Sequence, residues 1–135
     1  MITEDYVSFE TAKLLKEKGF DEEIETLIRP DGSIYFLDEN NTFSSVRHIK
    51  IKNSDINIYS DSVSCPTLQM AMKWLRKEHG LFIRVTEDIT GSIFEWSVYQ
   101  KSYGCRMSTY VEDSYEKACE TAIKYCLKIL TTLKN

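Results

Sequence analysis

The chain has 135 residues, which is the size of one ordinary domain. Hydrophobic residues make up 42% and charged residues 28%, proportions that argue against wholesale disorder. Lys and Arg number 17 against 21 Asp and Glu, so the net charge of −4 has the opposite sign to that of a generic nucleic-acid coating protein. We expect residues 1–135 to form a single globular domain, and the composition alone selects no activity.

The N-terminal residues and the cysteines predict a cellular compartment. Residues 1–6 lack the basic stretch followed by an apolar run that is typical of a secretory signal. The longest apolar runs are a few residues, far short of the roughly 20 that span a bilayer. Four cysteines are too few for a disulfide scaffold in this chain. We therefore predict a reduced, cytoplasmic protein that does not enter a membrane.

Three segments have the spacing of apolar residues that is typical of amphipathic helices. The first covers residues 9–18 and follows Ser8, a suitable N-cap. The second covers residues 66–79 and begins with a proline, whose missing N–H is not needed in the first turn. The third begins at Asp113, which with Glu116 forms an acidic capping box, and continues for about five turns.

Two β-hairpins are predicted in the first half of the chain. Segments 24–29 and 33–37 flank Pro30-Asp-Gly32, where proline presets φ and glycine takes a positive φ. The acidic residues 21–23 would alternatively begin a short helix. A second, weaker hairpin over residues 48–59 would turn at Asn53-Ser54 and carry one apolar and one basic face.

The second half predicts the clearest strands. Segments 81–87 and 92–99 alternate between apolar and polar residues, and 105–111 adds a further strand. The order of all these elements predicts an α+β fold, with three helices packed on a mainly antiparallel sheet of four to six strands. Segments 12–19 and 72–80 are similar, and each precedes a hairpin whose turn ends in Gly-Ser-Ile. A duplicated helix–hairpin unit explains this similarity, and so does coincidence.

Three blocks of sequence point to a known family. The first contains Phe9-Glu-Thr-Ala-Lys-Leu-Leu-Lys-Glu-Lys-Gly-Phe20, the second combines Pro-Thr with Lys-Trp-Leu-Arg, and the third opens on Tyr-Glu-Lys-Ala. These blocks, at 4–22, 65–80 and 114–127, resemble the opening, central and closing segments of a family of short uncharacterised proteins encoded by gut anaerobes and by their phages and mobile elements. The resemblance implies a bacterial or phage cytoplasmic context. It implies no activity, cofactor or site residue.

A basic stripe runs along the weaker hairpin. It consists of Arg47, His48, Lys50 and Lys52, and Tyr59 lies in the second segment of the same predicted hairpin. Basic side chains in such a row are typical of surfaces that contact the phosphates of a nucleic acid or bind a nucleotide. The alternative is an ordinary solvated strand face.

Three further residues are candidates for binding. Trp74 lies among the cations of the second helix, where it is a partner anchor if exposed and part of the core if buried. Tyr103 and Arg106 lie in a tyrosine-rich loop, and both residue types are favoured in protein interfaces.

The sequence contains no arrangement typical of catalysis or metal binding. Cys119 and Cys126 are about 10 Å apart along one helix and cannot form a disulfide. No Cys-x-x-Cys or His-x-x-x-His spacing suggests zinc. Cys65 or Cys105 would act as a catalytic thiol only with a histidine nearby. We therefore predict no catalytic residues, no metal and no cofactor.

These observations favour a non-catalytic binding or interaction module of phage or mobile-element type, with a protein as its partner. The alternative is a nucleotide or nucleic-acid binder that uses the basic stripe. A thiol-dependent enzyme is the third interpretation. The edge strands of the predicted sheet also allow a homodimer formed by strand pairing.

Overall fold

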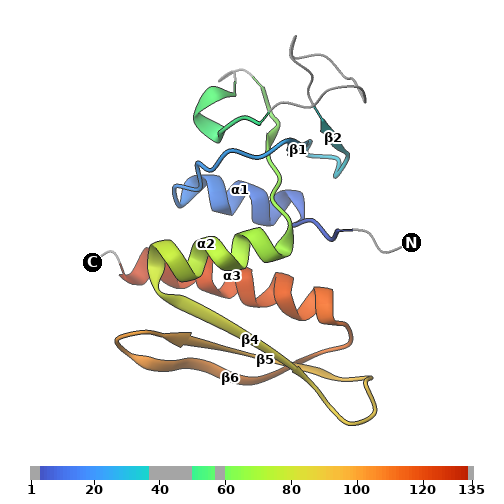
Figure 1. Cartoon of the computed structure of the whole chain (residues 1–135), viewed down its shortest axis with the longest axis vertical. Helices are drawn as coiled ribbons and strands as arrows, with labels where there is room; N and C mark the ends of the chain where they lie inside the picture. The colour runs from blue at the N-terminus through green and yellow to red at the C-terminus, as the bar shows by residue number, and fades with distance from the viewer. Residues whose placement is uncertain (1–3, 37–49, 57–59, 134–135) are drawn as a thin grey trace. The chain divides into compact units, whose positions relative to one another are not determined.

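The computed structural model of the protein describes residues 4–36, 50–56 and 60–133 (Figure 1). These residues form three α-helices and two three-stranded antiparallel sheets, which confirms the predicted α+β class. The chain divides into an N-terminal unit, Tyr6–Thr67, and a C-terminal unit, Leu68–Asn135 together with Met1–Asp5. The expectation that residues 1–135 form a single domain stays a prediction.

The N-terminal unit contains one helix and one sheet. Its elements are α1 (Phe9–Glu17), β1 (Thr26–Ile28), β2 (Ile34–Phe36), the 3-10 helix η1 (Asn53–Asp55) and β3 (Val63–Ser64). The strand order is β2-β1-β3, so β1 is the central strand. All three residues of β1 are buried, and α1 packs close to β3.

Helix α1 begins where the sequence predicts and ends one residue earlier, with Lys18 as its C-cap. The Ser8 hydroxyl accepts a hydrogen bond from the backbone N–H of Thr11 at 3.2 Å, which satisfies one of the free donors of the first turn. Gly19 follows the helix with a φ of 97°, a conformation that costs glycine nothing. Ala12 and Leu15 are fully buried and anchor the helix in this unit.

The β1–β2 hairpin is confirmed, and the alternative helix at residues 21–23 is wrong. Arg29 and Ser33 close the turn with a backbone hydrogen bond of 3.0 Å, and the Asp31 carboxylate accepts from the Ser33 N–H at 2.8 Å. Asp21 instead accepts two hydrogen bonds from Ser54, so it joins the loop before β1 to η1.

The weaker hairpin is wrong where the structure describes it. Ile51 pairs with Ile24 in an antiparallel bridge, and Asn53 begins the 3-10 helix η1 instead of a two-residue turn. The buried Asn53 amide donates to the Phe20 carbonyl at 2.8 Å and accepts from the Ser64 N–H at 3.0 Å. Residues 37–49 and 57–59 of this region lie outside the described residues.

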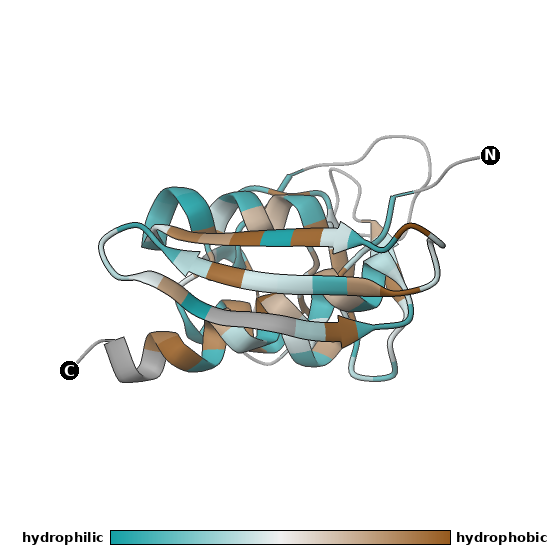
Figure 2. Cartoon of the chain, turned by 90° about the horizontal axis from the view of Figure 1, so that it is seen from below, coloured by the Kyte–Doolittle hydropathy of each residue, from teal (hydrophilic) through white to brown (hydrophobic). Residues whose placement is uncertain are grey.

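The C-terminal unit places two helices on one face of a sheet (Figures 1 and 2). Its elements are α2 (Leu68–His79), β4 (Leu81–Glu87), β5 (Phe94–Gln100), β6 (Gly104–Glu112) and α3 (Tyr115–Leu133). The strand order is β4-β5-β6, and all three predicted strands are confirmed. Helix α3 packs across the three strands, whereas α2 packs against β4 and α3.

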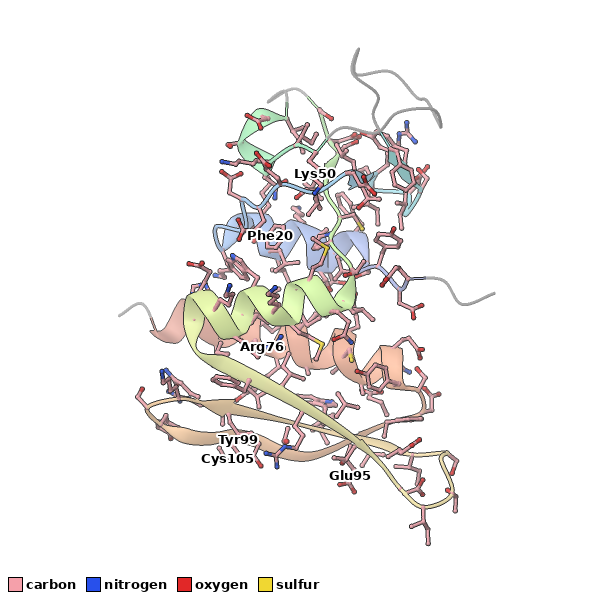
Figure 3. All side chains as sticks on the ribbon, viewed as in Figure 1. Phe20, Lys50, Arg76, Glu95, Tyr99 and Cys105 are labelled. Carbon is pink, nitrogen blue, oxygen red and sulfur yellow. The ribbon has the colours of Figure 1, made fainter. Side chains whose placement is uncertain are left out.

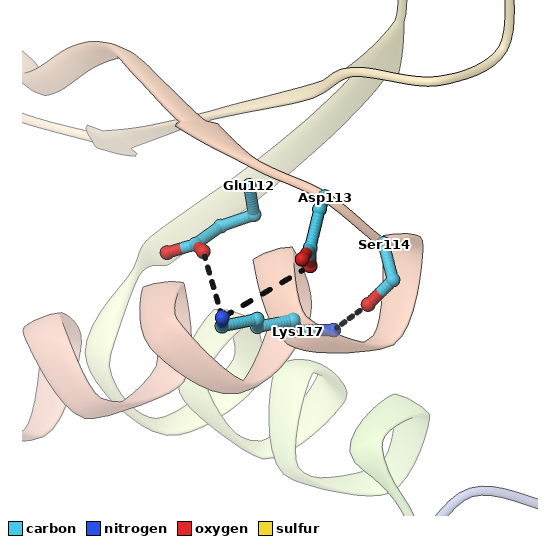
Figure 4. Close-up of polar contacts among 4 residues, drawn as sticks. All are labelled: Glu112, Asp113, Ser114 and Lys117. Atoms are coloured by element: carbon cyan, nitrogen blue, oxygen red, sulfur yellow. Dashed lines mark hydrogen bonds and ion pairs between the residues drawn. The ribbon is translucent and has the colours of Figure 1, made fainter.

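Both helix starts in this unit differ from the prediction. Helix α2 begins two residues after Pro66, because the Pro66 carbonyl accepts from the Val7 N–H and Thr67 pairs with Tyr6 in an antiparallel bridge. Helix α3 is capped by Ser114, whose hydroxyl accepts from the Lys117 N–H at 3.1 Å (Figure 4).

Asp113 therefore does not form the predicted capping box. Its carboxylate lies 4.0 Å from the Lys117 ammonium, which is also 3.9 Å from Glu112 (Figure 4). Beyond the cap, the buried face of α3 has the helical spacing that the sequence predicts. It consists of Ala118, Cys119, Ala122, Ile123, Cys126, Leu127 and Leu130.

The internal duplication is not confirmed. The first strand after α1 is the central strand of its sheet, whereas the first strand after α2 is an edge strand. The two helix–hairpin segments thus occupy different positions in their sheets. The described strands also form two sheets of three strands each, whereas the sequence predicts one sheet.

Candidate functional site

The basic stripe is only partly within the described residues. Arg47 and His48 lie outside them, whereas Lys50 is exposed and Lys52 half-buried in the N-terminal unit (Figure 3). Hydrogen bonds from the Ser54 backbone and hydroxyl lower the pKa of Asp21, and the charge of Lys52 lowers this pKa further. Recognition of a nucleotide or nucleic acid by the stripe stays a prediction.

Trp74 is part of the core. Its side chain is only 7% exposed, and its ring meets the His79 imidazole edge-on at 4.8 Å between centroids. Burial favours the core alternative that the sequence left open, since a partner anchor must reach the surface.

Tyr103 in the β5–β6 turn and Arg106 near the start of β6 are brought together, so Arg106 lies on a strand and not in the predicted loop. The Arg106 guanidinium lies 3.5 Å from the centroid of the Tyr103 ring, and its Nε donates to the Gln100 side chain at 2.7 Å. The Arg106 carbonyl accepts from the Tyr125 hydroxyl of α3 at 3.1 Å. Tyr103 remains 64% exposed, so the pair presents an aromatic ring on an arginine that is held in place.

A second group of aromatic and arginine side chains lies on the sheet face opposite α2 and α3. We call it the outer-face cluster, and it consists of Phe82, Arg84, Tyr99 and Cys105. Phe82 pairs with Tyr99, which pairs with Cys105, so these three form one row across the sheet. Tyr99 and Cys105 lie on the underside of the sheet in Figure 3, away from the helices.

The outer-face cluster is accessible and ordered by its own contacts. Phe82 is 41% exposed, Cys105 is exposed, and the Arg84 guanidinium lies 5.0 Å from the centroid of the Tyr99 ring. The neighbouring residues of β4 and β5 point the other way, and Leu81, Trp96 and Val98 are buried. Tyr99 belongs to the tyrosine cluster around the 102–108 loop that the sequence indicates, whereas no sequence pattern indicates Phe82 as a binding residue. Strand alternation puts both on the face of Arg84.

The cysteines differ in access, which bears on the thiol-dependent interpretation. Cys65 is fully buried and its thiol donates to the Val7 carbonyl at 3.4 Å. Burial raises the pKa of Cys119, and it raises that of Cys126 to about 12. Cys105 is therefore the one exposed thiol among the described cysteines.

Within the described residues, no three His, Cys, Asp or Glu side chains are grouped so that they could hold a metal ion. None of the described helices has the length and apolar character that crossing a membrane requires. Comparison of the chain with protein-family models, with curated proteins and with solved structures finds no match in any of the three. The candidate sites are thus described from the geometry of this chain alone.

Proposed function

We propose that the protein is a non-catalytic binding module that docks another protein chain on the outer face of the β4-β5-β6 sheet. The observation that supports this proposal is the outer-face cluster, in which a row of Phe82, Tyr99 and Cys105 crosses the sheet and Arg84 lies over Tyr99. Aromatic residues and arginine are enriched in protein interfaces and carry much of their binding energy.

The chemistry of the partner follows from Arg84. Among the described residues, its guanidinium has no hydrogen-bond or ion-pair partner, while the Tyr99 ring 5.0 Å away restricts its position. A guanidinium held on a ring loses less side-chain entropy on binding and keeps its N–H groups for a carboxylate. The partner surface is therefore an apolar patch for Phe82 and Tyr99 that is flanked by Asp or Glu.

The sheet supplies a rigid platform for such docking. Helix α3 packs against all three strands on the opposite face, and its Tyr125 hydroxyl bonds to the β6 backbone. Because the strands are already held in place, binding of a partner costs little backbone conformational entropy. We also propose that the protein acts in a phage or mobile element, because the three sequence blocks resemble a family that such elements encode.

A site-specific photo-crosslinker tests the proposal. The photoreactive amino acid p-benzoylphenylalanine is placed at Phe82 in one variant and at Ile34 in a control variant, which are 41% and 40% exposed. After irradiation in bacterial cells of the natural host, we expect an adduct of one defined mass from position 82 and none from position 34. Arg84→Glu should abolish the adduct, whereas Lys128→Glu, a change on the exposed side of α3, should leave it.

Two results would contradict the proposal. Adducts of equal yield from both positions would indicate non-specific contact, and an adduct that survives Arg84→Glu would exclude the outer-face cluster as its cause. An adduct of twice the chain mass would replace the proposed partner with a second copy of this chain.

A further inference from the structure

A groove runs along α1 in the N-terminal unit, apart from the outer-face cluster. It has a volume of about 650 Å³, within the range of small-molecule sites. One wall is the face of α1 that carries Phe9, Lys13, Lys16 and Glu17. These positions span about 12 Å at the helical rise, so the groove is elongated. The opposite wall consists of Pro30, Ser60, Asp61 and Val63.

The segments that line the groove are held in place by contacts with one another. The Tyr35 hydroxyl of β2 donates to Ser62 at 2.7 Å, and the Arg29 guanidinium lies 4.1 Å from the centroid of the Tyr35 ring. These contacts join the turn that carries Pro30 to the segment that carries Asp61. The Val7 N–H donates to the Pro66 carbonyl at 3.1 Å, which joins the start of α1 to the end of the same segment. The groove is thus largely pre-formed.

The charged side chains of the groove have no ion-pair partners among the described residues. Lys13, Lys16, Glu17 and Asp61 are exposed, and none of them has an ion-pair partner among the described residues. Lys13 and Glu17 are four residues apart, a spacing that often forms an ion pair on a helix, yet none forms here. The apolar side chains Phe9, Pro30 and Val63 line the same groove. A complementary ligand therefore carries both signs of charge and an apolar body.

We infer that the groove along α1 binds a zwitterionic molecule with apolar side chains, of the short-peptide class. The ligand carboxylate lies at Lys13 and Lys16 on α1, and its ammonium lies at Asp61 on the opposite wall. The apolar side chains rest on Phe9, Pro30 and Val63. A tripeptide in extended form is about 10 Å long, a length that the groove of about 12 Å can hold.

Titration of the full chain with trileucine, followed by amide NMR shifts, tests this inference. We expect saturable shifts that are confined to residues 9–17, 29–31 and 60–63. Asp61→Asn and the double change Lys13→Gln/Lys16→Gln should each raise the Kd by about two- to fivefold, as expected for exposed ion pairs. Lys128→Gln, on an exposed position of α3, is the matched control and should leave the Kd unchanged.

End-blocked peptides assign the two charges of the ligand. N-acetyl-trileucine should bind more weakly and no longer respond to Asp61→Asn, whereas trileucine amide should no longer respond to the lysine changes. Phe9→Ser, a change at a half-buried position, should weaken both blocked forms because it removes apolar contact. Absence of saturable shifts, shifts outside the groove, or equal responses of blocked and free peptides would overturn the inference.

Discussion

Ser114 and Asp113 are adjacent residues that are both suited to cap α3, and only Ser114 does so. Its hydroxyl accepts from the Lys117 N–H, which would otherwise have no partner in the first turn (Figure 4). We expect Ser114→Ala to lower the free energy of unfolding by about 1 kcal/mol. Urea denaturation followed by circular dichroism measures this change.

Asp113→Ala is the matched control for that prediction. The Asp113 side chain is 81% exposed and its carboxylate reaches Lys117 only at 4.0 Å. An exposed ion pair of this kind adds little to stability. A larger loss from Asp113→Ala than from Ser114→Ala would contradict the assignment of the cap.

The Asp88 carboxylate makes the stability of the β4–β5 turn depend on pH. It accepts from the Thr90 hydroxyl and from the N–H groups of Ser92 and Ile93, and these bonds lower its pKa from the ordinary value of 3.8. Because the folded pKa is depressed, this stabilisation is present above pH 3.8 and disappears as the pH falls through the folded pKa.

Asp88→Asn should therefore be less stable than the wild type at pH 7, and the difference should shrink at acid pH. Unfolding free energies of both proteins between pH 7 and about pH 2.5 measure this difference. Asp31, whose pKa is lowered by the Ser33 hydroxyl and N–H, predicts the same trend for Asp31→Asn. A difference that stays constant with pH would contradict the role of the charged carboxylates.

At the scale of whole elements, the packing of α3 determines which thiols can react. Cys119 and Cys126 lie on its buried face, and burial raises the pKa of both thiols. Because the thiolate is the reactive form, a thiol that is both buried and protonated is inert. We expect one of the four cysteines to react rapidly with Ellman's reagent in the native protein, namely Cys105, which is exposed.

Cys105→Ser should remove the fast phase, and the remaining three thiols should react only after denaturation. A second fast thiol in the native protein would show that the packing of α3 or of Cys65 is looser than its burial indicates. Slow reaction of Cys105 itself would mean that the outer face of the sheet is covered in solution.

Elements with strong local signals are predicted well from the sequence. The alternation in 81–87 and the Ser8 cap of α1 depend on residues close together in the chain, and both are confirmed. The weaker hairpin fails because the role of Asn53 depends on distant partners. Its side chain joins the Phe20 carbonyl to the Ser64 N–H, and no local pattern reveals that pairing.

The candidate sites are less predictable than the elements, for the same reason. Tyr103 and Arg106 are found from the sequence because they are three residues apart in the chain. The outer-face cluster requires the cross-strand register and the knowledge of which sheet face the helices cover. The groove along α1 has walls from three segments that are far apart in the sequence, so no single motif indicates it.

At the scale of the whole molecule, the question is whether the two units unfold together or separately. They contain about 60 and about 70 residues, sizes at which a single hydrophobic core is marginal on its own. The chain passes between them at Asp5–Tyr6 and at Thr67–Leu68, and neither crossing contains glycine or another feature of a flexible linker. We therefore expect the units to unfold together.

A core truncation in one unit, read in the other, measures this coupling. Leu27 lies in the central strand β1 and is 2% exposed, so Leu27→Ala should lower the free energy of unfolding by about 2–5 kcal/mol. If unfolding is cooperative, the slowest-exchanging amides of β5 lose hydrogen-exchange protection by the same free energy as those of β1. Ile89→Ala, at a fully exposed position of the β4–β5 turn, should change neither. Protection that falls in β1 and stays intact in β5 would show instead that each unit is stable by itself, and the groove and the outer-face cluster would then belong to independently folding parts.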